Sequence, residues 1–324
     1  MKLLLSYDGS DCAEAAIDDL VRAGLTDEGQ ALVLSVAEVW LPPVHGRNVT
    51  GIKLDAHTER MIQNHWKRAE KAVADAQMMA NRAKVRLQRI VPNWEIAAEA
   101  TYGSPAWEII TRAAKFKPDL IVAGSHGRSA ISRLFLGSIS QKVLTEAHCS
   151  VRVARGRVEV DPAPMRIILG YDDSEGAKAA VKAVASRKWR EETEVRLITA
   201  TDPIHPSLIE KFIPPTAQLI EEVNDDEHKW AEKVGERAMK VLRKSGLKAS
   251  LHIHPGNPKR ILVEEAEKWH ADCIFVGANA FGSRLERFLL GSTSASVAAH
   301  AHCSVEVVRK MRKRNVKPKE SQSN

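Results

Sequence analysis

The residues of this 324-residue chain best suited to joint chemistry are glycines and serines of one segment: Gly124, Gly127, Gly137, Ser138 and Ser140. The segment follows an aliphatic run and ends where a helical pattern begins. Glycine has no Cβ, so a ligand can approach the backbone, and a helix N-terminus offers N–H donors to an anion. The serine hydroxyls could add further donors to phosphate oxygens. The segment therefore indicates a phosphate-binding loop, although it has neither the ending of a Walker loop nor the spacing of a dinucleotide fingerprint.

Asp8 is a second candidate, because it follows the first aliphatic run of the chain. In an open parallel sheet, ligands bind beyond the carboxyl ends of the strands, which would bring Asp8 near the glycine and serine segment. A structural interpretation stays open for each residue alone. Asp-Gly-Ser also makes a turn and a helix start, and a glycine or serine at such positions often serves a turn or an N-cap. The combination of features favours ligand binding.

An internal repeat defines the elements that must position these residues. Residues 3–10 read Leu-Leu-Leu-Ser-Tyr-Asp-Gly-Ser and return as Ile-Ile-Leu-Gly-Tyr-Asp-Asp-Ser at 167–174. The segment Ala-His-Cys-Ser-Val at 147–151 returns 154 positions later. We therefore expect four parts: a first domain at 1–155, a linker at 156–164, a second domain at 165–309 and a basic disordered tail at 310–324.

Within each half, aliphatic runs alternate with helical patterns, the order typical of a parallel sheet with right-handed crossovers. A long amphipathic stripe from Ile62 to Leu87 is expected to cover the sheet or a neighbouring helix. The predicted fold class is α/β, with two tandem doubly wound domains, each a five-stranded parallel sheet with helices on both faces. The predicted strands are 2–6, 31–37, 95–100, 119–123 and 150–154, then 166–171, 194–200, 248–253, 273–277 and 304–308.

Charge and hydropathy restrict the class of protein further. The net charge is +7, but the residues from Lys310 onward carry +5 of it, which leaves only +2 on the rest. We favour a solubilising or loosely anion-attracting tail over a specific nucleic-acid module, because base readout needs a structured element. No apolar stretch approaches the ~20 residues that span a bilayer, and the N-terminus has no cleavage-like site. We expect a cytoplasmic protein without a membrane partner.

Cysteines and histidines indicate neither a disulfide framework nor a metal site. The four cysteines stand alone without a C-x-x-C pair, so we expect buried or half-buried thiols. His252 and His254 share a strand face, but no spacing of cysteines or carboxylates completes a metal site. The repeated His-Cys pairs at 148–149 and 302–303 fit a structural turn better than an activated thiol. His126 could approach a phosphate but has no evident orienting carboxylate.

Several motifs together resemble the universal stress protein family. Gly124, two residues, Gly127, nine residues and Gly137-Ser138 are similar to the ATP-binding signature of that family. The strand-Asp-Gly-Ser opening, a Gly-x-Pro in each half and the closing His-Cys-Ser-Val strands are similar too, over roughly residues 1–309. The resemblance implies a bound adenine nucleotide, ATP with Mg²⁺.

The resemblance also assigns roles to the first-half residues. It implies that Asp8 lies near the base and that Gly124 and Gly127 line the ribose and phosphates. The positions that would take phosphate oxygens are Gly137, Ser138 and Ser140, with Arg128 beside them.

The second half departs from the family pattern. Ala280 stands where the second glycine should be, and ten residues rather than nine separate Ala280 from Gly291. An added methyl group and a shifted register could block a phosphate, although Gly282 could restore its approach. Nucleotide binding in this half stays open, and its ligating positions would be Asp172, Gly277, Gly291, Ser292 and Ser294.

The last strands, 150–155 and 304–309, would leave exposed sheet edges that need a partner. The resemblance implies that the two halves pair there as an internal pseudo-dimer, which could dimerise again. The expected function is that of a nucleotide-binding stress-response sensor or regulator with little turnover, because only Arg128 is visible as a charge-stabilising group. The alternatives are a slow ATP-hydrolysing or adenylyl-transfer enzyme on the same scaffold, and an interaction protein that binds no nucleotide.

Overall fold

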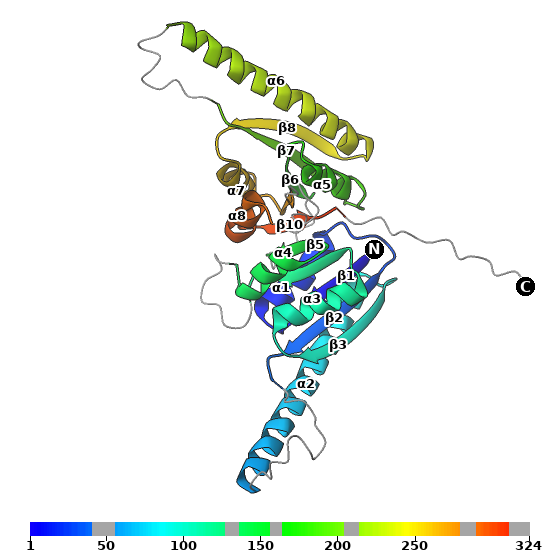
Figure 1. Ribbon diagram of the computed structural model, residues 1–324. Coiled ribbons are helices and arrows are strands. Elements are labelled where there is room, and N and C mark those ends of the chain that lie inside the picture. The colour runs from blue at the N-terminus through cyan, green and yellow to red at the C-terminus, as the bar shows by residue number, and fades with distance from the viewer. Residues whose placement is uncertain (41–55, 127–135, 156–163, 204–213, 279–289, 311–324) are drawn as a thin grey trace, which may run out of the picture.

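The computed structural model describes residues 1–40, 56–126, 136–155, 164–203, 214–278 and 290–310. Strands and helices alternate along both halves of the chain (Figure 1). The first half contains β1 (Lys2–Ser6), α1 (Asp11–Asp19), the 3₁₀ turn η1 (Leu20–Arg22), β2 (Gln30–Ala37), α2 (Ala56–Ile90), β3 (Glu95–Tyr102), α3 (Pro105–Phe116), β4 (Leu120–Gly124), α4 (Ser138–Glu146) and β5 (Ser150–Ala154). The second half contains β6 (Arg166–Gly170), α5 (Glu175–Ala185), β7 (Glu194–Thr201), α6 (Pro214–Lys244), β8 (Lys248–Pro255), α7 (Pro258–Lys268), β9 (Cys273–Gly277), α8 (Ser292–His300) and β10 (Ser304–Val308).

The helices begin where the sequence supplies caps. The Ser174 hydroxyl accepts a hydrogen bond from the backbone N–H of Ala177 at 3.1 Å and so caps α5, and Ser10 does the same for α1. Both α3 and α7 begin with a proline. Proline suits this first position because its φ is already helical and its missing N–H is not needed there. These local signals fix the points at which the chain leaves each strand and enters the following helix.

Ten strands form one sheet in the order β3-β2-β1-β4-β5-β10-β9-β6-β7-β8. All the strand pairs within each half are parallel, whereas β5 and β10 pair antiparallel through Val151, Arg152 and Val153. The predicted fold class is therefore confirmed, and each predicted strand end lies within two residues of the observed one. The predicted pairing of the two last strands within the chain is also confirmed.

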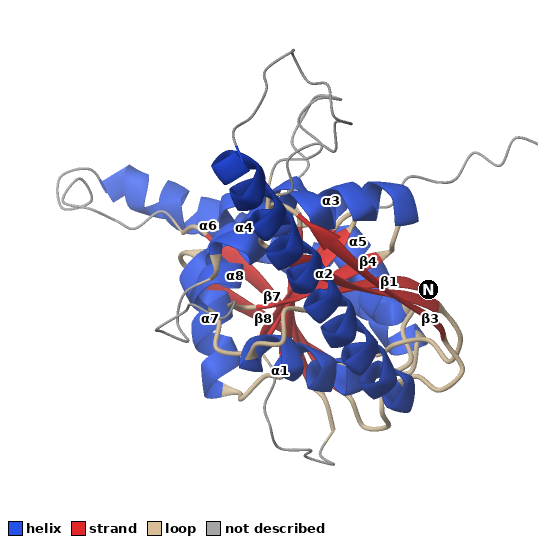
Figure 2. Cartoon of the chain, turned by 90° about the horizontal axis from the view of Figure 1, so that it is seen from below, coloured by secondary structure: helices blue, strands red, loops and turns tan. Residues whose placement is uncertain are grey.

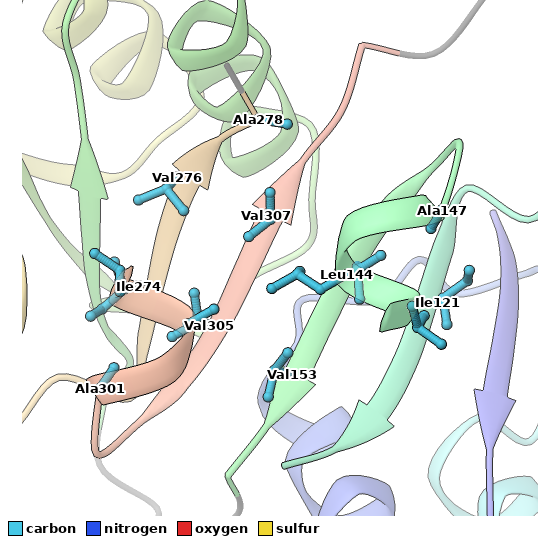
Figure 3. Close-up of a cluster of buried hydrophobic side chains, with 14 of the residues drawn as sticks. Ile121, Leu144, Ala147, Val153, Ile274, Val276, Ala278, Ala301, Val305 and Val307 are labelled. Carbon is cyan, nitrogen blue, oxygen red and sulfur yellow. The ribbon is translucent and has the colours of Figure 1, made fainter. Parts of the chain in front are cut away.

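Helices cover both faces of the sheet (Figure 2). In the first half, α1 and α2 pack on one face through residues such as Ile17 and Leu87. α3 and α4 pack on the other, and their apolar layer continues across β5 and β10 to α7 and α8. Figure 3 shows Val153 of β5 and Val305 of β10 in this layer, with Leu144 of α4. One continuous core thus joins the two halves on that face.

The amphipathic stripe of α2 covers the sheet over only part of its length. Ala69, Ala76 and Leu87 are buried as expected, but Ile62 is 38% exposed, so the prediction was wrong for the N-terminal turns. The helix extends past the sheet in Figure 1. Its 35 residues at about 1.5 Å each reach about 52 Å, whereas the eight residues of β3 span about 26 Å. The periodicity reports a face of the helix but not the length of the surface beneath it.

Candidate functional site at the carboxyl ends of the strands

A cavity of about 120 Å³ opens in the second half, where β6, β7 and β9 end. Four of the five positions predicted for this half line it together, namely Asp172, Gly277, Gly291 and Ser294. Ser292 is exposed and is not among the lining residues. The other lining residues are Gly170, Tyr171, Ser174, Ala177, Ile198, Ala200, Pro258, Leu262, Val276 and Thr293.

These other lining residues were not singled out from the sequence, although their positions carry a signal. Tyr171 follows β6 directly, and Ala200 lies near the end of β7. Ser174 and Pro258 stand at helix starts. The residues after the strand ends and the first residues of the following helices therefore form the cavity together.

Asp172 is held by a local turn. Its Oδ1 accepts a hydrogen bond from the backbone N–H of Ser174 at 3.1 Å, and its side chain is exposed. Asp8 has the same arrangement in the first half, where its Oδ1 accepts from the N–H of Ser10 at 3.0 Å. The turn that starts the next helix thus fixes each carboxylate just beyond the carboxyl end of its strand.

The strand-end glycines have a packing role that the sequence did not reveal. A Cβ on Gly277 would lie 2.2 Å from the carbonyl carbon of Gly176, and a Cβ on Gly176 would lie 2.4 Å from the carbonyl oxygen of Ala278. A Cβ on Gly124 would lie 2.8 Å from the backbone of Cys12. The missing side chains therefore let α5 and α1 approach the ends of β9 and β4, in addition to leaving the backbone open to a ligand.

Ser140 and Ser294, which were predicted to bind a phosphate, donate their hydroxyl protons to backbone carbonyl oxygens. The Ser140 hydroxyl donates to the carbonyl oxygen of Gly124 at 2.6 Å, and the Ser294 hydroxyl donates to that of Gly277 at 2.7 Å. Both serines are buried. A hydroxyl has one proton, and a buried carbonyl at a strand end needs a donor. In this arrangement the two serines tie α4 and α8 to the strands that precede them.

The N-termini of α4 and α8 are built alike. Gly137 and Gly291 are the N-cap residues, both with extended backbone, and no side chain in the described part of the chain caps either helix. Ser138 and Ser292 follow them and are exposed. A helix N-terminus that is not capped by a side chain keeps its N–H donors and positive dipole end for an anion.

Part of the predicted first-half loop lies outside the described residues. Gly127 and Arg128 belong to that part. In the second half, Ala280 and Gly282 also lie outside the described residues. The predicted tail beyond Lys310 and nearly all of the predicted linker lie outside them too.

His126 is the last residue of that loop that the structure describes before Leu136, and it is buried. Its Nδ1 lies 3.0 Å from the Ser125 hydroxyl, and its Nε2 has no hydrogen-bond partner in the described part of the chain. Burial, and then the nearby charge of Arg155, lower the pKa of His126 below its ordinary value. The imidazole is therefore neutral at neutral pH.

The cysteines match the expectation of buried or half-buried thiols. Cys149 and Cys273 are buried, and Cys12 and Cys303 are half-buried. Burial raises the pKa of the Cys149 and Cys303 thiols to about 12 each, so both are protonated and poor nucleophiles at neutral pH.

The described residues contain neither a metal-binding cluster nor a membrane-spanning helix. Among them, no three His, Cys, Asp or Glu side chains gather where they could hold a metal ion. Across the same ranges, none of the helices combines the length and apolarity needed to cross a membrane.

The fold is that of a tandem α/β protein, with a cavity at the carboxyl ends of the strands of its second half. The sequence model of the universal stress protein family matches residues 1–155 and again residues 164–309. The chain therefore belongs to the universal stress protein family, with two copies of its domain in tandem.

Individual relatives agree with this assignment. A universal stress protein of Thermus aquaticus is 34% identical over 153 residues, covering 47% of this chain and 97% of its own length. The universal stress protein Rv2005c of Mycobacterium tuberculosis is 24% identical over 275 residues, 83% of this chain and 82% of its own. The crystal structure of a universal stress protein from Archaeoglobus fulgidus has a TM-score of 0.56 at 19% identity and covers 95% of this chain and 96% of that one.

Proposed function

We propose that this chain binds an adenine nucleotide, ATP with Mg²⁺, and acts as a sensor or regulator in the stress response. The first domain carries the family's glycine pattern intact, and the second carries an altered site. The observation that supports this proposal most is the cavity in which Asp172, Gly277 and Gly291 meet, although they stand far apart in the sequence. The convergence matches the ligand site expected at the carboxyl ends of a parallel sheet.

The composition of the cavity fits part of a nucleotide. Ile198, Leu262 and Val276 give it apolar walls, while Asp172 and Ser174 supply polar groups at its edge. About 120 Å³ is below the roughly 300–1,000 Å³ of pockets that enclose a drug-sized ligand. The cavity therefore suits one ring system such as a base, with the phosphates outside it.

The phosphates have a candidate partner in the helix that closes the same cavity. Gly291 begins α8, whose N-terminus has no side-chain cap from any residue that the structure describes. Its backbone N–H groups and its dipole favour an anion. The Mg²⁺ ion needs no protein cage, because Mg²⁺ is usually held by nucleotide phosphates, water and one or two carboxylates.

The first domain repeats the same local structure. Asp8, Gly137 and Ser140 make the bonds and cap that Asp172, Gly291 and Ser294 make in the second. The sequence adds Gly127 and Arg128 in the loop between them. We therefore place the principal nucleotide site in the first domain.

Equilibrium dialysis of the full chain with ATP and Mg²⁺ tests the proposal. We expect at least one nucleotide per chain. Gly127→Val should remove the first-domain site by placing a branched side chain in the loop, and Gly291→Val should remove any second-domain site. Gly246→Ala is the control, because nothing lies within 4 Å of its added methyl group. No binding by the unmodified chain at millimolar ATP would refute the proposal.

A further inference from the structure

Arg155 and Arg309 follow the last strands of the two domains, and each reaches into the opposite domain. The Arg155 Nη2 donates to the carbonyl oxygen of Ala298 in α8 at 2.6 Å. The Arg309 Nη2 donates to the carbonyl oxygen of Leu144 in α4 at 2.5 Å. The two contacts are related by the internal repeat.

The backbone of each arginine is anchored across the same boundary. The Arg155 N–H donates to the Ser304 hydroxyl at 2.9 Å, and the Arg309 N–H donates to the Ser150 hydroxyl at 3.2 Å. Within the described residues, the other hydrogen bonds of the two guanidinium groups also go to the opposite domain. Nε of both arginines is buried without a hydrogen-bond partner there. Each side chain therefore directs its hydrogen bonds to the other domain.

The helices that receive these bonds are the ones that form the candidate sites. α4 and α8 have nine residues each, about 13 Å. Gly137 and Gly291 begin them at the site, and the arginines bind carbonyls near their far ends. A cation at a helix C-terminus satisfies carbonyl oxygens that lack an intrahelical donor and complements the helix dipole. A helix this short moves as one piece, so support at one end also fixes the other.

Arg155 also has an electrostatic effect within its own domain. Its charge helps to lower the pKa of His126, which lies in the loop after β4. Arg155 therefore acts on the first domain through its charge, and it binds α8 of the second domain through its hydrogen bond.

We propose that Arg155 and Arg309 are cross-domain positioning residues, each of which fixes the site helix of the opposite domain. Occupancy of one site then changes the affinity of the other, and by linkage the effect is reciprocal. The coupling of affinities rests on the proposed function, whereas the support of α4 and α8 across the domain boundary does not.

Hydrogen exchange of the full chain tests the support directly. In Arg309→Met we expect the amides of α4 to exchange about tenfold faster while those of α8 keep their rates. In Arg155→Met we expect the reverse. The control is Arg260→Met, an exposed arginine on α7 that pairs with Glu264 in its own helix, and it should change neither helix. Arg309→Lys and Arg155→Lys keep a cation at each position and should recover part of the protection from exchange. They replace the Met variants if those do not fold.

ATP affinity is measured in the Gly291→Val variant, in which only the first-domain site remains. There, Arg309→Met should weaken ATP binding to that site by about fivefold, because the N-terminus of α4 loses its support from the opposite domain. Faster exchange in both helices alike, or only in the domain that carries the substitution, would overturn the inference. If each substitution speeds exchange only in the helix of the opposite domain, but the unmodified chain binds no ATP, the cross-domain support is confirmed and the proposed function is refuted.

Discussion

Arg152 and Glu306 stand opposite each other where the two domains join, in the antiparallel pair of β5 and β10. They occupy equivalent positions of the repeat, and their side chains are fully buried with Nη1 and Oε2 3.4 Å apart. Asp19 accepts from Nε of Arg152 at 2.5 Å, and Arg187 donates to Glu306 at 2.8 Å. Two identical domains would place like charges here, so the network suits the pairing of unlike domains within one chain.

Arg152→Met should lower the free energy of unfolding by about 3–5 kcal/mol, because it leaves two buried carboxylates with one cation. Urea unfolding measures the change. The matched control is Arg112→Met, whose partner Glu99 lies 2.8 Å away in a partly exposed pair, and it should cost about 1 kcal/mol or less. Equal small losses in the two variants would contradict the assignment of a buried network.

Gly277→Ala should destabilise the second domain by about 1–3 kcal/mol, because the new methyl group would overlap the backbone of Gly176. Thermal unfolding checks this. Gly246→Ala meets open space and has only the strain of its positive φ, so about 1 kcal/mol is expected. If Gly277→Ala is no less stable than that control, the close approach of α5 to β9 is wrong.

Ser294→Ala and Ser292→Ala separate a structural serine from an exposed one. Ser294 donates to the buried carbonyl oxygen of Gly277, so its removal should cost about 1–3 kcal/mol. Ser292→Ala should leave stability unchanged within about 0.5 kcal/mol and weaken nucleotide binding if its N-terminal turn holds a phosphate. Thermal unfolding with and without ATP measures both effects. A stable Ser294→Ala variant would show that the hydroxyl does not tie α8 to β9.

His126 should make stability depend on pH. Its pKa in the folded chain lies below the ordinary value of 6.5, so the unfolded chain takes up the proton first as pH falls. Stability is then complete above about pH 6.5 and declines as pH falls from there towards the lowered pKa. Urea unfolding from pH 8 to pH 5 should show a smaller decline in His126→Gln than in the unmodified chain. His228→Gln, an exposed histidine on α6, controls for the loss of one imidazole. An unchanged profile in His126→Gln would contradict the burial of this ring.

The fold could be predicted from the sequence because its signals are local. The aliphatic run of β1 and the caps at Ser10 and Ser174 each act within a few residues. The contact of Gly277 with Gly176, by contrast, joins elements about a hundred positions apart, and no local pattern encodes it. The same holds for the contact of Arg309 with α4. Four of the positions that line the cavity were therefore predictable, while the others and the reasons for the residue types needed the packed structure.

The number of ATP molecules bound per chain tests the central claim most directly. A calorimetric titration of the full chain with ATP and Mg²⁺ should give at least one site, and Gly127→Val should lose the heat of that site while its thermal unfolding without ligand stays unchanged. The absence of binding heat at millimolar ATP, or the same isotherm in Gly127→Val, would contradict the account.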